Sequence, residues 1–445
     1  MTPESIAEHN ADQDYPRPAY AWYVVGVLVV AYTFSFIDRM LLTLLVDPIR
    51  ASLHISDVQI GLLHGLAFAI FYTTLGIPIA RYADRLSRTR IISAGVLVWS
   101  FTTALCGLAR NFSQMFLARI GVGVGEAALS PAGYSLLSDY FPPRKLPFAL
   151  SVYQAAIFLG TGAALITGGA MIAAVPAMTL PVVGYMEPWR VVFLVVGLPG
   201  ILVVLLMRTV REPHRKGMLA GARPGEAISI RTVVHYVTDR RAAYGLLIIG
   251  FAIKSMIWNG VSAWIPTHFM RTFHWSAAQV GLWYGMAVIV FGMGGIVVGG
   301  LVSARLRKRG YASANVWPSV LATVGMLPTG VIAPLLPNPA ASLAVYCLFI
   351  FSSSFPVGSF AAALQEITPN QMRAQISALY LFVSNLVALT LGPTLIAMLT
   401  QYAFRDSTLI RYSMATFPAI VAPIAALLLW RALKPYQVAL QNVRF

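Results

Sequence analysis

Long apolar segments recur along this chain and constrain its fold more than any other feature. A helix of about 20 apolar residues crosses the hydrocarbon core of a bilayer, which is about 30 Å thick. Only 11% of the residues are charged and 58% are hydrophobic, whereas about 25% charged residues is typical of soluble domains. These values exclude a soluble enzyme, a disulfide scaffold and a disordered chain. Runs this long also argue against an outer-membrane barrel, whose strands would alternate in hydrophobicity.

Twelve membrane-spanning helices are expected, so the predicted fold class is an all-α polytopic membrane protein. The predicted spans cover residues 20–46, 58–80, 90–109, 112–140, 147–174, 189–207, 243–268, 278–302, 313–335, 341–366, 372–400 and 409–430. One long polar connection divides them six and six. The predicted domains are therefore an acidic tail (1–19), a first six-helix bundle (20–207), a linker (208–242), a second bundle (243–431) and a short tail (432–445).

The linker contains apolar residues at helical spacing, namely Ile230, Val233, Val234 and Val237. This pattern predicts a short helix with one apolar face. Such a helix could lie on the bilayer surface, or the segment could be a solvated basic linker with some helix, and the two readings are equally compatible with the residues.

Basic residues are distributed unequally between the two sets of alternate loops. Of the 32 Lys and Arg residues, 23 lie in one set of loops and tails, six lie in the other set, and Arg39, Arg119 and Lys254 lie inside spans. Cytoplasmic loops carry the excess of Lys and Arg. We therefore expect a multi-pass membrane protein with both termini in the cytoplasm. The net charge of +16 then reflects topology, and no nucleic-acid partner is expected.

The two halves of the chain contain an internal repeat. Shifting the sequence by 220 residues places Ser56–Ala67 on Ser276–Ala287, and nine of the 31 positions from 56 to 86 are identical without a gap. A shift of 227 places Asp139 on Glu366. Because each half contains six spans, the repeats would be related by an axis along the membrane normal. Such duplications build transporters whose site lies between the halves, near mid-membrane.

Four charged residues lie deep inside predicted spans: Asp38 and Arg39 in the first, and Arg119 and Glu126 in the fourth. Each lone charge at such a depth costs at least ~3 kcal/mol, so these side chains are expected to avoid lipid and to form one polar cluster between the two spans. The cluster could be a fixed ion pair with a purely structural role, but ionisable groups inside membranes are functional by default. The carboxyls could accept a proton when an arginine is drawn away by an anion, which is a minimal mechanism for proton coupling.

The loop after the second span reads Asp84-Arg85-Leu-Ser-Arg88-Thr-Arg90. This sequence resembles the signature of the major facilitator superfamily, a small residue followed by D-R-x-G-R-[RK], with Ala80 and Ser87 in place of two glycines. The resemblance implies two six-helix bundles and a cytoplasmic gate that uses Asp84, Arg85 and Arg88. The corresponding segment of the second half, Ala304–Arg309, keeps the basic residues without the carboxylate.

Two further segments, residues 32–46 and 119–144, resemble the spinster branch of this superfamily, and in particular its bacterial homologues. They contain the charged pair of the first span, the sequence R-x-x-x-G-x-G-E-A from Arg119, and Asp139-Tyr-Phe-Pro-Pro-Arg144. The resemblance implies a proton-linked transporter of lysophospholipids or sphingosine-1-phosphate-like amphiphiles, located in the bacterial inner membrane. It also implies that Asp38 and Glu126 sense protons and that Arg39 and Arg119 are their charge partners.

Several other polar and aromatic residues within the spans could line a substrate cavity. These candidates are Lys254, Tyr153, Trp258, Asn259, Tyr380 and Asn385. Lys254 could equally extend toward the cytoplasmic interface.

Two other functions remain open: a proton-driven exporter of small drugs or organic anions, and a membrane-embedded lipid-metabolising enzyme. The enzyme reading is disfavoured because the seven histidines are scattered without metal-ligand spacing. No histidine is expected beside the buried carboxyls, and no cofactor, metal or catalytic residue is predicted. We expect a monomer whose partners are an amphiphilic substrate, protons and membrane lipids.

Overall fold

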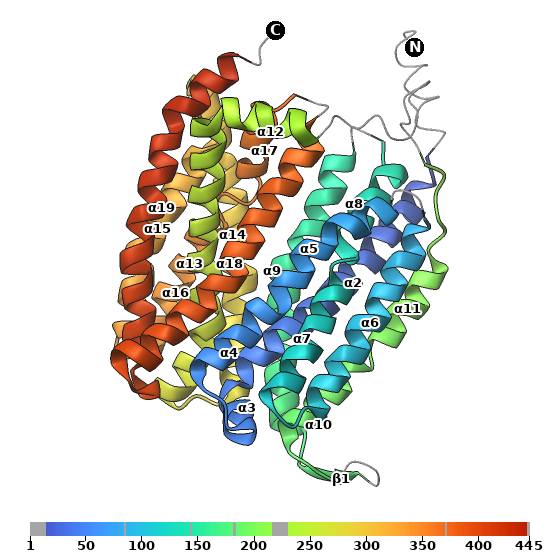
Figure 1. Ribbon diagram of the computed structural model, residues 1–445, viewed down its shortest axis with the longest axis vertical. Coiled ribbons are helices and arrows are strands. Elements are labelled where there is room, and N and C mark those ends of the chain that lie inside the picture. The colour runs from blue at the N-terminus through green and yellow to red at the C-terminus, as the bar shows by residue number, and fades with distance from the viewer. Residues whose placement is uncertain are drawn as a thin grey trace.

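The computed structural model describes residues 15–83, 86–142, 145–180, 184–215, 230–369 and 372–442. It consists of two groups of helices side by side, joined by a segment that includes the short helix α12 (Figure 1). The first group contains α2 (Pro18–Leu44), α3 (Val46–Leu53), α4 (Asp57–His64), α5 (Leu66–Ala83), α6 (Arg88–Leu108), α7 (Phe112–Glu126), α8 (Leu129–Tyr140), α9 (Leu146–Ala174), α10 (Pro188–Gly197) and α11 (Gly200–Thr209). The linker helix α12 is Ile230–Asp239, and the second group contains α13 (Arg241–Phe273), α14 (Ala277–Lys308), α15 (Trp317–Ile332), α16 (Pro339–Ser354), α17 (Ser359–Glu366), α18 (Arg373–Met398) and α19 (Ile410–Gln441).

In the described part of the second group there are also two 3-10 helices, η1 (Ala333–Leu335) and η4 (Ser407–Leu409), and a π-helix, η3 (Leu399–Phe404). A hairpin of β1 (Met178–Leu180) and β2 (Gly184–Met186) joins α9 to α10. The hairpin and α3 lie at one end of the molecule, which we call the hairpin end. Helix α12, the start of α2 and the end of α19 lie at the opposite end, which we call the terminal end (Figure 1).

Each of the twelve predicted spans corresponds to a helix or to consecutive helices. Eleven segments of the described ranges are long and apolar enough to cross a membrane. The remaining span, predicted at 112–140, consists of α7 and α8, which are separated at Ala127 and Ala128. Pro131 explains this break, because it has no N–H to donate to the carbonyl of Ala127 and its ring crowds that carbonyl. Pro199 lies within the similar break between α10 and α11.

The internal repeat is visible in the local backbone geometry. His54 and His274, which are 220 residues apart, both adopt a left-handed conformation, with φ of 52° and 56°. Two residues later, Ser56 and Ser276 cap α4 and α14, and each forms a capping box with the glutamine three residues further on. The two halves therefore begin their second span with the same turn and the same cap.

The two groups of helices meet along α9 and α14 and along α4, α5 and α18. Glycines form much of the first contact. A Cβ atom at Gly162 would overlap the carbonyl oxygen of Gly285, and one at Gly169 would overlap that of Ala277. Gly281 and Gly285 face the backbone of α9 in the same way. The glycines of the fifth predicted span thus serve close helix packing.

The linker helix packs against the protein itself. Val233 is buried among residues of the second bundle, and Tyr236 donates a hydrogen bond to the carbonyl of Ile367 at 3.1 Å. Val234, by contrast, is exposed. The sequence pattern predicted the helix but did not indicate its contact with the end of the second bundle, and the expected position on the bilayer surface stays a prediction.

The charge distribution predicts the orientation of the hairpin and of α12. Single cysteines introduced at the exposed positions Tyr185 in β2 and Thr238 in α12 should differ in their reaction with a membrane-impermeant maleimide. The native Cys106 and Cys347 are buried, so they should contribute little background. In intact cells the cysteine at 185 should react, whereas the cysteine at 238 should react only after lysis. Labelling of position 238 in intact cells would contradict the predicted topology.

Candidate functional site

A central cavity of about 120 Å³ lies between the two bundles. Its charged and titratable side chains on the first bundle are Arg39 from α2, His64 from α4 and Arg119 from α7. The second bundle contributes aromatic, amide and hydroxyl groups, including Trp258, Asn259 and Ser262 from α13 and Tyr284 from α14. The remaining lining residues are Phe36, Met40, Thr43, Phe68, Ile157, Phe158, Thr161, Ala263, Leu389 and Pro393.

The cavity wall contains a buried ion pair between two helices. Arg39 Nε donates to Glu126 Oε2 at 2.6 Å, and Arg39 Nη2 also contacts this oxygen. Ser35 adds a hydrogen bond to the same atom at 2.7 Å. The Arg39 guanidinium lies over the rings of Phe36, Phe68 and Tyr72, at 4.3 Å from the centroid of Phe68. Ion pairing and cation–π contacts together replace the water that these charges lose on burial.

The second charged pair of the cluster is less completely satisfied. Asp38 and Arg119 are both buried, and Arg119 Nη1 donates to the backbone carbonyl of Asp38 at 3.4 Å. Within the described ranges, Asp38 Oδ1, Arg119 Nε and Glu126 Oε1 are buried atoms without a hydrogen-bond partner. The predicted cluster of the first and fourth spans is present, and part of its hydrogen-bonding capacity is unused.

Glycines on α7 bring the helices of this cluster close together. A Cβ atom at Gly123 would overlap the carbonyl oxygen of Phe68 in α5, and one at Gly125 would lie against the backbone of Gly95 and Trp99 in α6. Arg119 and Glu126, two turns apart, therefore lie on a helix that packs almost backbone to backbone with its neighbours.

The predicted cavity residues fall into two groups. Trp258 and Asn259 line the central cavity, whereas Lys254, Tyr153, Tyr380 and Asn385 are not among its lining residues. Lys254 is buried, lies over the ring of Phe251 and donates to the carbonyl of Ser353. Tyr153 stacks on Tyr32.

His64 is a functional candidate that the sequence reasoning missed. His64 lines the same cavity as Arg39 and Arg119, whereas the expectation that no histidine lies beside the carboxyls of Asp38 and Glu126 stays a prediction. An isolated histidine in an apolar run carries no local signal. Only the packing of α4 against α7 brings it near Arg119, 55 positions along the chain.

At the terminal end, the predicted gate is described in part. Asp84 and Arg85 lie outside the described residues. Arg88 is buried at the start of α6, where it pairs with Asp139 and donates to Glu212 at 2.7 Å. Burial alone would raise the pKa of Glu212, but hydrogen bonds from the Thr89 N–H and from Arg88 outweigh it and hold this pKa below its usual value.

The second half has a similar ion pair at the same end. Arg307 contacts Glu366 at 2.5 Å, and Tyr436 donates to the same carboxylate at 2.5 Å. Glu366 is the residue that the 227-residue shift places on Asp139. Glu366 is therefore the counterpart of Asp139 and not of Asp84, whose position in the second half is taken by Ala304. In both halves an arginine pairs with a carboxylate near the end of another helix.

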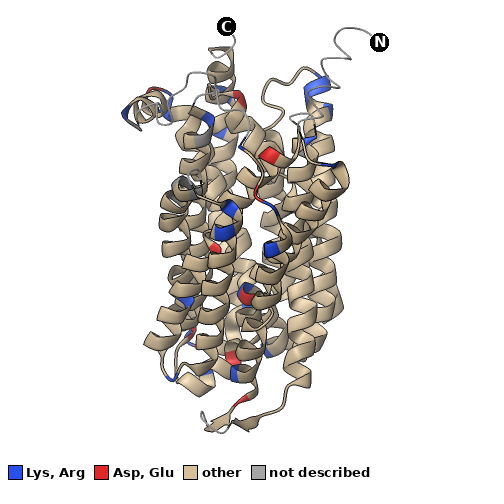
Figure 2. Cartoon of the chain, turned by 90° about the vertical axis from the view of Figure 1, so that its right-hand side faces the viewer, with Lys and Arg blue, Asp and Glu red and all other residues tan. Residues whose placement is uncertain are grey.

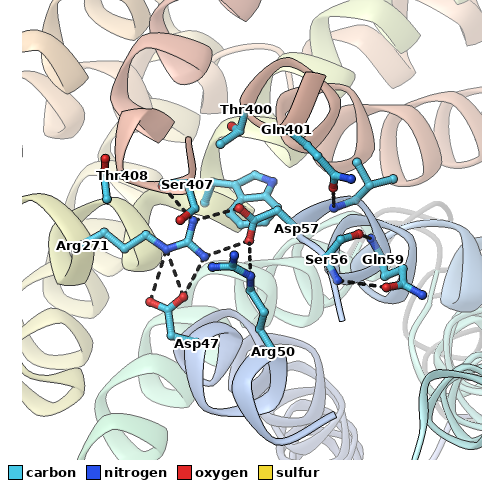
Figure 3. Close-up of polar contacts among 12 residues, drawn as sticks. Asp47, Arg50, Ser56, Asp57, Gln59, Arg271, Thr400, Gln401, Ser407 and Thr408 are labelled. Carbon is cyan, nitrogen blue, oxygen red and sulfur yellow. Dashed lines mark hydrogen bonds and ion pairs between the residues drawn. The ribbon is translucent and has the colours of Figure 1, made fainter. Parts of the chain in front are cut away.

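At the hairpin end, an ion-pair network joins the two bundles (Figure 3). Arg271 at the end of α13 donates to Asp47 of α3 at 2.7 Å and to Asp57 of α4 at 2.8 Å. It also donates to the carbonyl of Ser407 at 3.1 Å. We call Arg271, Asp47 and Asp57 the Arg271 network. Arg271 and Asp57 expose only 8% and 5% of their side chains, so this contact is largely desolvated.

A second polar contact between the bundles lies beside the network. The backbone N–H of Val58 donates to the side-chain oxygen of Gln401 at 3.2 Å. Charged residues thus occur both at the two ends of the molecule and within its body (Figure 2). Those in the body include the cavity cluster, and the Arg271 network at the hairpin end links the two bundles.

Two duplicated six-span bundles, with a central cavity between them, define a membrane transporter and not an enzyme. The family model described as Major Facilitator Superfamily matches residues 28–393, and the chain belongs to this superfamily.

Solved structures and curated relatives are consistent with this assignment. A crystal structure of a bacterial homologue of the human lysosomal transporter spinster, inward-facing and unoccupied, matches with a TM-score of 0.79 and 26% identity, over 96% of this chain and 98% of that one. An MFS-type efflux pump of Mycolicibacterium smegmatis is 28% identical over 403 residues, which are 89% of this chain and 88% of the relative. Protein spinster of Drosophila melanogaster is 27% identical over 348 residues, which are 76% of this chain and 52% of that protein.

The Arg39–Glu126 pair should behave as a unit in stability measurements. Arg39→Ala leaves the Glu126 carboxylate buried without its partner, so it should destabilise the protein by about 3–5 kcal/mol. The double variant Arg39→Ala/Glu126→Ala should be more stable than Arg39→Ala alone. Thermal unfolding of the purified protein in detergent measures both variants, and additive losses would show that the two side chains do not interact.

Proposed function

We propose that the protein is a proton-coupled secondary transporter of an amphiphilic anion, such as a lysophospholipid or a sphingosine-1-phosphate-like lipid. The central observation is the asymmetry of the cavity. Its cationic side chains, Arg39 and Arg119, come from the first bundle, whereas the second bundle contributes aromatic, small and neutral polar groups. An anionic headgroup is expected to bind the cationic wall, because guanidinium groups are the natural ligands of phosphate.

The size of the cavity supports a site for a headgroup. Its volume of about 120 Å³ is below the roughly 300–1,000 Å³ of sites that enclose drug-sized ligands. A lysolipid would therefore place its charged group in the cavity and its chain outside it. The apolar chain would then lie between helices or along the apolar lining, where water is already excluded.

Proton coupling is supported by competition for the same arginines. Arg39 is engaged by Glu126, so an anion that binds Arg39 must weaken this pair. A buried carboxylate that loses its cation is destabilised in its charged form and tends to take up a proton. Asp38, whose Oδ1 has no hydrogen-bond partner in the described part of the chain, provides a second proton-accepting group.

For alternating access, we propose that the terminal end faces the cytoplasm of a bacterial cell and that the hairpin end faces outward. The Arg271 network then closes the outer side in this structure. The similarity of the whole chain to an inward-facing spinster homologue supports that assignment. Asp84, Arg85 and Arg88 would close the cytoplasmic side in the opposite state.

Export of small organic molecules is the second candidate, because one relative is an MFS-type efflux pump. Purified protein in liposomes distinguishes the two. A pH gradient should be imposed across the liposome membrane in the presence of lysolipids, sphingoid phosphates or cationic drugs. The internal pH and the amount of each compound transported should then be measured. Proton-linked movement of the anionic lipids alone would support the proposal, and movement of the drugs alone would favour the efflux pump.

The carboxyls should be essential for coupling. Glu126→Gln or Asp38→Asn should abolish pH-driven transport, because each amide keeps the side-chain volume but cannot carry the proton. The variants should remain folded, as thermal unfolding in detergent can confirm. If the double variant Asp38→Asn/Glu126→Gln transports with an unchanged pH dependence, coupling through this cluster is wrong.

The Arg271 network should control the conformational equilibrium. Arg271→Gln removes a cation that two carboxylates share, so it should weaken the inward-facing state by about 1–3 kcal/mol. Spin labels should be placed at the hairpin end, one on each bundle. The distance between them should lengthen, or its distribution should broaden, relative to the parent protein. Arg411→Gln, at the same end but outside the network, is the matched control and should leave these distances unchanged.

A further inference from the structure

His64 lies where α4 passes into α5. Gly65, the residue that follows it, ends α4, and a Cβ atom there would overlap the carbonyl oxygens of Leu389 and Thr390 in α18. The chain is therefore held against the second bundle at this point. His64 itself faces the central cavity.

One ring nitrogen of His64 lacks a hydrogen-bond partner. Nε2 is buried, and no described side chain or backbone group satisfies it. The ring packs edge-on against Trp264, with the centroids 6.1 Å apart, but Trp264 Nε1 donates to the carbonyl of Pro393 at 3.0 Å. An unsatisfied buried polar atom costs about 1–3 kcal/mol, so its presence in a cavity calls for a ligand.

Arg119 presents an unsatisfied donor to the same space. Its Nε is buried without a partner among the described residues, and its guanidinium lies within electrostatic range of the His64 ring. Both guanidiniums of the cavity face the Phe68 ring, with Arg39 at 4.3 Å and Arg119 at 5.9 Å from the centroid. With the ring hydrogen on Nε2, His64 donates to this space as the arginines do, so donors from α2, α4 and α7 converge on one small volume.

We propose that His64 is a specificity-determining residue that binds the terminal anionic group of the substrate together with Arg119. Donors from three helices suit a group with three terminal oxygens, so the site selects a phosphate monoester over a phosphodiester of the same chain length. This inference rests on the proposed transport of an amphiphilic anion. It adds a residue and a headgroup class that the pair of arginines alone does not define.

Three variants of the full chain test the role of His64. His64→Phe keeps a ring of similar size and removes the nitrogen, whereas His64→Gln keeps a hydrogen-bond donor. His54→Asn is the matched control, because His54 is exposed and its left-handed backbone conformation suits asparagine. Since Nε2 has no partner, His64→Phe should not lower the unfolding temperature of the ligand-free protein, which separates a binding role from a structural one.

Binding should be measured in nanodiscs with oleoyl lysophosphatidic acid, a monoester, and oleoyl lysophosphatidylglycerol, a diester. The parent protein should bind the monoester more tightly. His64→Phe should lose roughly tenfold or more in monoester affinity, as expected for a hydrogen bond to a charged group, and much less in diester affinity. His64→Gln should retain most of the preference, and His54→Asn should retain all of it.

Equal losses for the two lipids, or no loss for either, would overturn the role of His64. Failure of the parent protein to bind any lysolipid would instead overturn the proposed function. In that case phenyl phosphate, titrated against the same variants, still tests the residue. Weaker binding of phenyl phosphate by His64→Phe supports the assignment, and unchanged binding rejects it.

Discussion

Charge inside an apolar bundle must be neutralised by charge or dipoles from another helix, and the centre of this protein is built around that requirement. Arg39 of α2 reaches Glu126 of α7, and Arg119 of α7 reaches the backbone of Asp38. Each of these side chains alone would cost at least ~3 kcal/mol in lipid. Separation of the two helices would therefore have a large free-energy cost. The glycines of α7 then allow α5 and α6 to approach, which closes the first bundle around the cluster.

The duplication of the chain explains its shape, and the divergence of the two halves explains its chemistry. The repeated features lie toward the ends: the left-handed histidines, the serine caps and the pairs Arg88–Asp139 and Arg307–Glu366. At the centre the repeat is lost, because the first bundle provides the cavity's cations and the second provides its aromatic and neutral polar lining. A symmetric scaffold thus carries a polarised site, which is suited to a ligand with one charged end.

Features governed by local sequence were predictable, and features that depend on distant contacts were not. The spans, the short linker helix and the cluster of Asp38, Arg39 and Glu126 follow from hydrophobic runs, helical spacing and the cost of buried charge. The docking of α12 on Ile367, the partners of Arg271 and the position of His64 depend on chain segments 50 to more than 200 residues away. From the sequence alone, a single histidine inside an apolar run, or an arginine at the end of one, gives no indication of whether its side chain contacts lipid, backbone or a ligand.

The α9–α14 contact has a mechanical consequence. Glycine faces backbone at Gly162 and Gly285 and at Gly169 and Ala277, and the Ile289 side chain of α14 fills the space beside Gly162 of α9. Rotation of one bundle on the other must therefore move such inserted side chains as well as the helix backbones. Because closely packed surfaces do not deform continuously, this contact favours discrete relative positions of the bundles, and its repacking would add to the barrier that the polar contacts at the two ends set between states.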